Sequence, residues 1–223
     1  MPRRAEVDLI YVTGLVQGLA LVTFPAASSI FTSPHGFGFS ASRYGMMFLP
    51  QVILAIIASS LGPRLARRWT LKRVLLAGLS ADLLAMTLLA LSRLLQDFPG
   101  AAYGTLLVAT GSLGFGFGAT VMAVNTYAEK FSPGREDRAV LVLNALLGAG
   151  TALAPLFVAV VIGLGAWWLL PLVVAVALGG TAFHWRKGAS RSAGRPAGRR
   201  AKFTASSAAV LAVCHRRSAL RNC

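Results

Sequence analysis

Charged residues are scarce in this chain, and acidic residues are the scarcest of all. Only 13% of the 223 residues are charged, seven are Asp or Glu, and 56% are apolar. The mean hydropathy is accordingly high, at +0.66. A soluble domain of this length needs far more polar surface to cover its core. The shortage of charge therefore excludes an ordinary soluble globular protein.

Cysteine and histidine are also rare. The two cysteines, Cys214 and Cys223, match no short-spaced zinc motif, and the three histidines are dispersed along the chain. No set of acid, base and nucleophile stands out, so an integral membrane enzyme is the weakest of the function classes considered. The sequence predicts no metal, no cofactor and no enzymatic activity.

Long apolar runs dominate the sequence. Each has about 20 residues or more, enough to cross a hydrocarbon core of about 30 Å as a helix. Strands of a membrane barrel would be about ten residues long and would alternate in polarity. We therefore predict an all-α polytopic membrane protein with six transmembrane helices, the first of them uncleaved. The runs are 7–31, 44–65, 74–94, 102–128, 139–163 and 166–185.

Basic residues are distributed unequally among the segments outside these runs. Each charge at the boundary of a run is assigned to the nearest connector. The segment before the first run then has two Lys or Arg residues, the second connector five, the fourth three and the segment after the sixth run ten. The alternate connectors have only two in total, against these 20. Because cytoplasmic loops carry the excess of Lys and Arg, both termini are predicted to be cytoplasmic. The expected location is the plasma membrane, with membrane lipid as a partner.

The segment 186–223 differs from the predicted transmembrane domain, 1–185. It has no acidic residue, and Ala, Arg, Ser and Gly supply 25 of its 38 positions. This low-complexity composition predicts disorder. A basic tail can bind anionic lipid or, without specificity, nucleic acid; no specific nucleic-acid recognition is predicted. The composition is also typical of out-of-frame translation of GC-rich coding sequence.

Polar side chains inside the runs are the candidates for function. An aspartate at a helix centre costs about 2.5–3.5 kcal/mol on membrane-insertion scales. Asp82 should therefore face protein or water, or be protonated, as a proton or cation site or as a buried hydrogen-bond anchor. Asn125 and Asn144 lie near the same end of consecutive helices, where they are expected to hydrogen-bond to one another or line a cavity.

Small residues recur along the fourth and fifth runs. Gly104, Gly111 and Gly118 are spaced by seven in the fourth run, and Gly148 and Ala152 lie on one face of the fifth. Small residues allow two helix backbones to approach closely. These two helices are therefore expected to pack against each other as antiparallel neighbours.

Two passages resemble the major facilitator superfamily of transporters. The connector "GPRLARRWTLKRVLLAGL" is similar to that superfamily's signature loop, although Arg67 stands where Asp is usual and Thr70 where Gly is usual. The passage "NTYAEKFSPGREDRAVLVLNALLGAGTALAP" resembles the fourth and fifth helices of sugar and metabolite members, particularly fucose-permease-like ones. The resemblance covers residues 8–185. Its signature-loop positions are Gly62, Leu65, Ala66, Arg67, Arg68, Lys72 and Arg73.

The resemblance implies one six-helix half of a twelve-helix transporter that moves a small organic solute, such as a sugar or metabolite, by alternating access. Its partner would be a second six-helix half or a second copy. In the superfamily, helices 1, 2, 4 and 5 line the path. The implied path candidates are Gln17, Gln51, Asn125 and Asn144. In a lone half, we expect them on an exposed inner face that promotes self-association or instability.

Its cost inside a span makes Asp82 the coupling-ion candidate, although the resemblance implies that the third helix packs outside the path. The resemblance also implies that Arg68 pairs with Glu129 at the cytoplasmic end of the fourth helix. A drug efflux antiporter half is a weaker alternative because Thr110 lies near the position where drug exporters carry an Arg. A membrane interaction protein without transport activity, or a transporter remnant, is a further alternative.

Overall fold

The computed structural model describes residues 4–193, which are helical and contain no strand. The helices are α1 (Arg4–Ala26), α2 (Ser28–Thr32), α3 (Ala41–Met46), α4 (Phe48–Arg68), α5 (Leu71–Leu91), the 3-10 helix η1 (Ser92–Leu95), α6 (Pro99–Phe131), α7 (Glu136–Gly163) and α8 (Leu169–Ala193). Six segments are long and apolar enough to cross a membrane, which confirms the predicted all-helical fold class with six candidate spans.

The chain divides into two compact units, 1–185 and 186–223. The helix α8 continues past the end of the last predicted run, to Ala193. The rest of the predicted disordered tail, 194–223, lies outside the described residues. The description below concerns the first unit.

Prolines interrupt the first two spans near one end of the bundle. Pro50 has no N–H to donate to the carbonyl four residues earlier. The helical path accordingly breaks at Met47, between α3 and α4. Pro25 lies in the last turn of α1, and the chain restarts as α2 one residue beyond the end of that helix. The chain therefore passes from the end of α1 to the start of α4 through the short helices α2 and α3.

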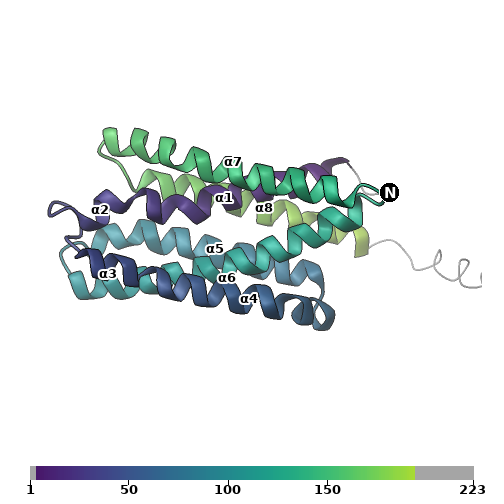
Figure 1. Cartoon of the computed structure of the whole chain (residues 1–223), viewed down its shortest axis with the longest axis horizontal. Coiled ribbons are helices and arrows are strands. Elements are labelled where there is room, and N and C mark those ends of the chain that lie inside the picture. The colour runs from purple at the N-terminus through teal and green to yellow at the C-terminus, as the bar shows by residue number, and fades with distance from the viewer. Residues whose placement is uncertain (1–3, 194–223) are drawn as a thin grey trace, which may run out of the picture. The chain divides into compact units, whose positions relative to one another are not determined.

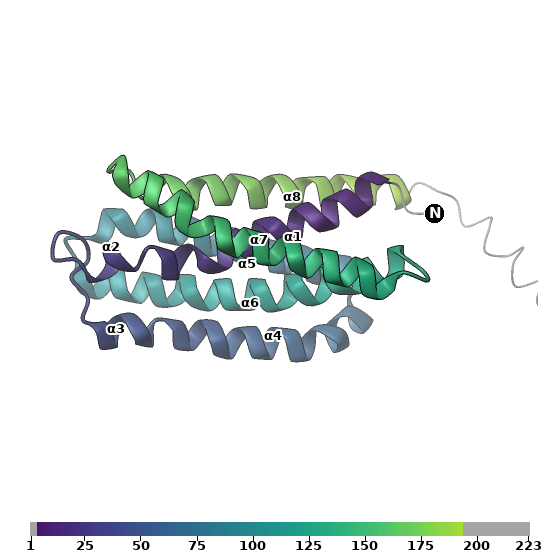
Figure 2. The same ribbon diagram turned by 45° about the horizontal axis from the view of Figure 1, so that its top comes forward.

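The six long helices form two layers (Figures 1 and 2). The front layer, nearest the viewer in Figure 1, contains α7, α1, α6 and α4 in that order, and α5 and α8 form the back layer. The closest helix pairs are α4–α6, α5–α6 and α1–α7. The central helices α1 and α6 are thus covered on several sides, whereas α4 and α7 form the edges of the front layer.

Glycines permit the closest helix pairs, but not the pair that the sequence suggested. In α6, Gly114 and Gly118 face the backbone of α4, and Gly111 faces Pro50 and Leu54 of the same helix. The expectation that this seam packs against α7 is therefore wrong. The α7 helix instead approaches α1 through its own Gly150 and the glycines of α1. The fourth-run seam is still a packing seam, but its partner is the second span.

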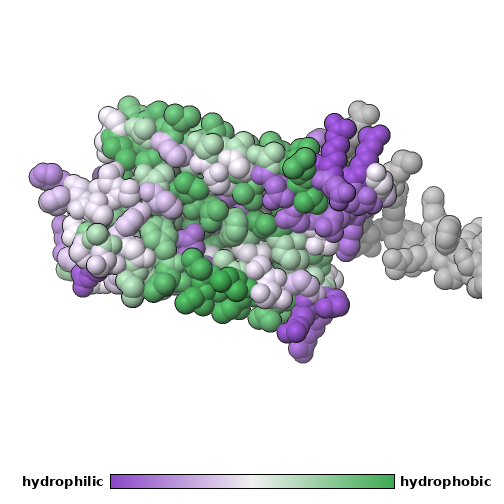
Figure 3. Space-filling view, viewed as in Figure 1, coloured by the Kyte–Doolittle hydropathy of each residue, from purple (hydrophilic) through white to green (hydrophobic). Residues whose placement is uncertain are grey.

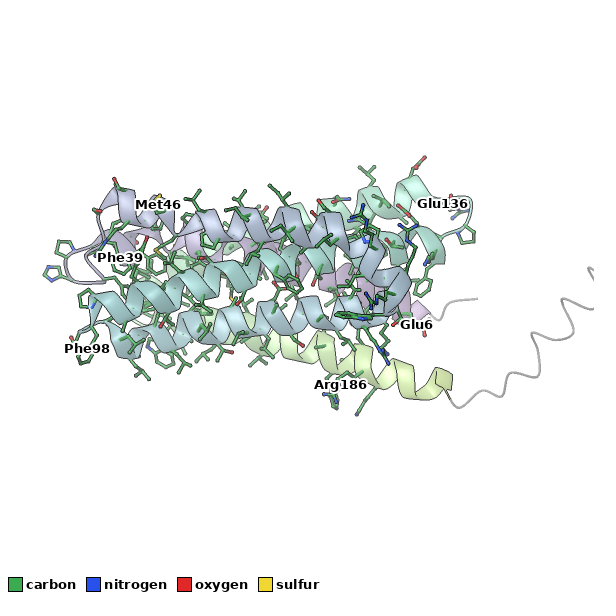
Figure 4. The ribbon with its side chains drawn as sticks, turned by 90° about the horizontal axis from the view of Figure 1, so that it is seen from below. Glu6, Phe39, Met46, Phe98, Glu136 and Arg186 are labelled. Atoms are coloured by element: carbon green, nitrogen blue, oxygen red, sulfur yellow. The ribbon has the colours of Figure 1, made fainter. Side chains whose placement is uncertain are left out.

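The surface of the unit separates by polarity (Figure 3). Apolar side chains cover the middle of the front face, and strongly polar side chains gather at the end of the unit where the chain begins, here called the basic end. Figure 4 locates this end by Glu6 and Glu136, with Phe39, Met46 and Phe98 at the opposite end. Apolar helices with charge concentrated at one end suit a membrane environment.

Candidate functional site

A buried polar cluster lies where α1, α5 and α6 meet. Asp82 and Thr120 are fully buried, and the Thr120 hydroxyl donates a hydrogen bond of 3.4 Å to Asp82 Oδ2. The equally buried Gln17 amide lies close enough to interact with the Asp82 carboxyl. It does not reach hydrogen-bond geometry, so Asp82 Oδ1 and both polar atoms of Gln17 have no partner. Such unpartnered buried atoms are rare in folded proteins and call for an explanation.

Helix geometry explains why the cluster forms there. Gly116 has no side chain, and Asp82 occupies the space that a Cβ at that position would fill. Gly78 lies one turn before Asp82 on α5, and Thr120 likewise occupies the space that a Cβ at Gly78 would fill. The two glycines thus bring a carboxyl and a hydroxyl together between antiparallel helices.

Two of the four path candidates are buried inside the bundle. Gln17 is fully buried and Gln51 is 9% exposed, with its Oε1 also unpartnered. The expectation that both lie on an exposed inner face is therefore wrong. The bulk of α6 covers Gln51, because Gly114 packs directly against its backbone.

The other two path candidates meet at the front layer. Asn144 Nδ2 donates a hydrogen bond of 3.3 Å to Asn125 Oδ1, which confirms the expected contact between them. Each amide also donates to the carbonyl four residues earlier in its own helix, at 2.8 Å. Asn144 is exposed and Asn125 is half-buried. The pair therefore presents fixed amide groups at the boundary between α6 and α7.

An open hollow of about 520 Å³ lies beside this pair at the basic end. Its lining consists of Glu129, Glu136, Asp137, Val140, Leu141 and Asn144. Three of the seven acidic residues of the chain thus face one hollow. Within residues 4–193, no group of three His, Cys, Asp or Glu side chains is close enough to hold a metal ion. The chemistry offered is hydrogen bonding by amides and carboxylates, which suits a neutral or cationic solute better than an anion.

The basic connector between α4 and α5 contains a strained residue. Thr70 has φ of 121°, a region that favours glycine. It is also the N-cap of α5, where its hydroxyl accepts a hydrogen bond of 3.4 Å from the Arg73 amide.

The predicted charge partners of the connector are both exposed. No ion pair joins Arg68 and Glu129 in the described part of the chain, and their pairing stays a prediction. Lys72 interacts electrostatically with Glu6, at the start of α1. An exposed arginine gains little from an ion pair in water, whereas Lys72 and Glu6 are both partly buried.

We predict that Thr70→Gly stabilises the protein by about 1 kcal/mol. Strain at a disfavoured φ costs about 1–3 kcal/mol, whereas a Gly in place of Thr at an N-cap costs only a few tenths. Chemical unfolding in detergent measures the difference. Ser40→Gly is the matched control, because Ser40 caps α3 in the same way with an ordinary φ of −63°. It should be neutral or destabilising; a stabilisation equal to that of Thr70→Gly would contradict the strain.

Sequence reasoning missed three residues that organise these sites. Thr120 supplies the hydrogen bond to Asp82, Trp185 donates to Thr13 Oγ1 at 3.3 Å, and Glu6 faces the connector. A signal existed for Thr120, because it lies one turn from Gly116 in a helix of small residues. None existed for Trp185, whose partner lies 172 positions earlier in the chain.

Comparisons with protein-family models, with curated proteins and with solved structures found no match to this chain.

Proposed function

We propose that this chain is a six-helix half of a transporter of the major facilitator type, which moves a small neutral polar solute such as a sugar by alternating access. The half spans a cell membrane with both termini on the cytoplasmic side. A second six-helix bundle, here a second copy of the chain, completes the solute path at the front layer.

One observation carries this proposal: the helix pairing follows an inverted repeat. The contacts of Gly14 with Leu143 and of Gly18 with Leu147 advance together, so α1 and α7 run in the same direction. The contacts of Gln51 with Gly114 and of Gly62 with Met122 also advance together, so α4 and α6 run in the same direction. The first span thus pairs with the fifth, and the fourth pairs with the second.

This is the pairing expected if a pseudo-two-fold axis in the membrane plane related the first three spans to the last three. The central helices α1 and α6 have opposite directions, and each takes its parallel partner from the other triplet. Inverted repeats of this kind are the usual basis of alternating access in secondary transporters. The front layer also contains the four helices that the resemblance assigns to the path.

The acidic hollow supports a neutral polar solute as the class of substrate. The Asn144 amide and the three acidic side chains that line it offer hydrogen-bonding groups to a polyhydroxylated solute, and the acidic side chains disfavour organic acids. If the hollow is the cytoplasmic mouth of the path, Asn125 and Asn144 are the first fixed polar groups that a solute meets.

A membrane interaction protein without transport activity is the second candidate. The observation in its favour is the burial of Gln17 and Gln51, which leaves only two of the four predicted path residues available to a solute.

The orientation predicts which loops an external reagent reaches. In a variant without Cys214 and Cys223, a single cysteine at Ser33 should react with a membrane-impermeant reagent added outside intact cells, and one at Thr70 should not. Ser33 lies between α2 and α3, and Thr70 lies in the basic connector between α4 and α5. The reverse labelling pattern would contradict the orientation.

Uptake by reconstituted vesicles tests the transport function. Because both termini are predicted to be cytoplasmic, two copies can be fused in tandem without an additional span. We expect saturable uptake of a sugar by the tandem, and none by single copies diluted until crosslinking detects only monomers. Saturable uptake by monomers would contradict the half-transporter proposal. No uptake by a folded tandem across a panel of sugars, amines and organic acids would favour the non-transporting protein.

A further inference from the structure

The Asp82 cluster contains no cation that balances a carboxylate. The residues beside the carboxyl are Gln17, Gly116 and Thr120, none of which ionises. The ionisable side chains of the surrounding helices lie toward the helix ends, and none forms an ion pair with Asp82 among the described residues. They are Glu6, Asp8, Tyr11, Arg64, Arg67, Arg68, Lys72, Arg73, Arg93, Tyr103, Tyr127, Glu129 and Lys130. An unpaired buried charge costs several kcal/mol, so the carboxyl needs a ligand that neutralises it.

The packing limits the size of that ligand. Asp82 fills the space left by Gly116, and Thr120 fills the space left by Gly78. The carboxyl oxygens therefore lie against backbone, and no described hollow includes Asp82. A sodium ion would need about six oxygen ligands and room for them, whereas a proton needs no additional volume.

We propose that Asp82 is a proton-binding site of the folded protein, and that the neutral acid joins α1, α5 and α6. Its Oδ1–H donates to Gln17 Oε1, while Thr120 donates to Oδ2. Protonation thereby gives a partner to two of the unpartnered buried atoms, Asp82 Oδ1 and Gln17 Oε1. Because α5 lies in the back layer, away from the proposed solute path, the bound proton has a structural role. This proposal does not depend on the proposed transport function.

Infrared spectroscopy tests this site without any substitution. Asp8, Asp97 and Asp137, the other three aspartates, are all exposed, whereas Asp82 is fully buried. We expect the folded protein at neutral pH to have the carbonyl band of a protonated carboxylic acid, and we expect this band to shift when the protein is labelled with ¹³C-aspartate. Absence of a label-sensitive acid band in folded protein would overturn the proposal.

Two variants assign the band and its partner. Asp82→Asn, which resembles the neutral acid in shape and donor capacity, should fold and lose the band, whereas Asp97→Asn should retain it. Gln17→Leu removes the acceptor, so the acid band should move to higher frequency as its hydrogen bond is lost. A band that survives Asp82→Asn would overturn the assignment to Asp82. A band unmoved by Gln17→Leu in folded protein would overturn the role of Gln17.

Discussion

Adding a single methyl group at Gly114 is expected to destabilise the bundle by about 3 kcal/mol. A Cβ at this position would overlap the backbone carbonyl of Gln51, which, unlike a side chain, cannot rotate away. Overpacking of a well-packed core typically costs about 1–3 kcal/mol, and a backbone contact places Gly114→Ala at the upper end. The change should separate α6 from α4, the closest helix pair of the front layer. Unfolding of the purified protein in detergent measures the loss.

The same substitution elsewhere in α6 is the control. Gly104 belongs to the same sequence seam, but a Cβ there would meet nothing within 4 Å. Gly104→Ala should therefore be neutral or stabilise the helix by up to about 1 kcal/mol, since Gly is the poorer helix former. Equal destabilisation by the two substitutions would mean that α6 does not pack on α4 as described.

Truncation of Trp185 is expected to have the largest effect of any single side chain, about 3–5 kcal/mol. Its ring is 7% exposed and lies 5.0 Å from the Tyr127 ring, centroid to centroid. Its Nε1 donates the 3.3 Å hydrogen bond to Thr13 Oγ1. This side chain therefore joins α8 to both α1 and α6.

Trp69 provides the control for Trp185. It also lies at the basic end, after α4, but it is 48% exposed. Trp69→Ala should lose well under half of the stability that Trp185→Ala loses, measured in the same unfolding assay. Trp185→Phe keeps the ring contact and removes the hydrogen-bond donor. Its loss of stability should therefore lie between the losses for Trp69→Ala and Trp185→Ala. Equal losses for Trp185→Ala and Trp69→Ala would contradict the attachment of α8 through this residue.

Hydrophobic runs predicted the helices well because length and apolarity are local properties. The break at Met47 is a departure within the second predicted run, and Pro50 accounts for it. The seam from Gly104 to Gly118 was recognised as a packing surface, but its partner was assigned by chain proximity. Consecutive helices share a short loop, yet α6 approaches α4 more closely because Gly114 and Gly118 meet the α4 backbone directly.

The candidate site was only partly accessible to sequence reasoning. Asn125 and Asn144 were expected to meet because both lie one or two turns from a short loop, and they do. The exposure of Gln17 and Gln51 was inferred from the helices on which they lie, without knowledge of which side faces α6. The direction in which a side chain points depends on helix rotation, and a bundle with polar residues on several faces does not determine that rotation.

The central claim, that a second copy sits on the front layer, can be tested by crosslinking in native membranes. One tagged copy receives a single cysteine at Ile56, which is 61% exposed on α4, and a second copy receives one at Gly148, on the exposed side of α7. Under a two-fold arrangement, α4 of each copy faces α7 of the other. A short bifunctional reagent should then join the two copies, whereas copies with a cysteine at Val176, 76% exposed on α8 in the back layer, should stay single. Crosslinking through Val176 in place of the front-layer pair, or no crosslinking at either position, would contradict the account.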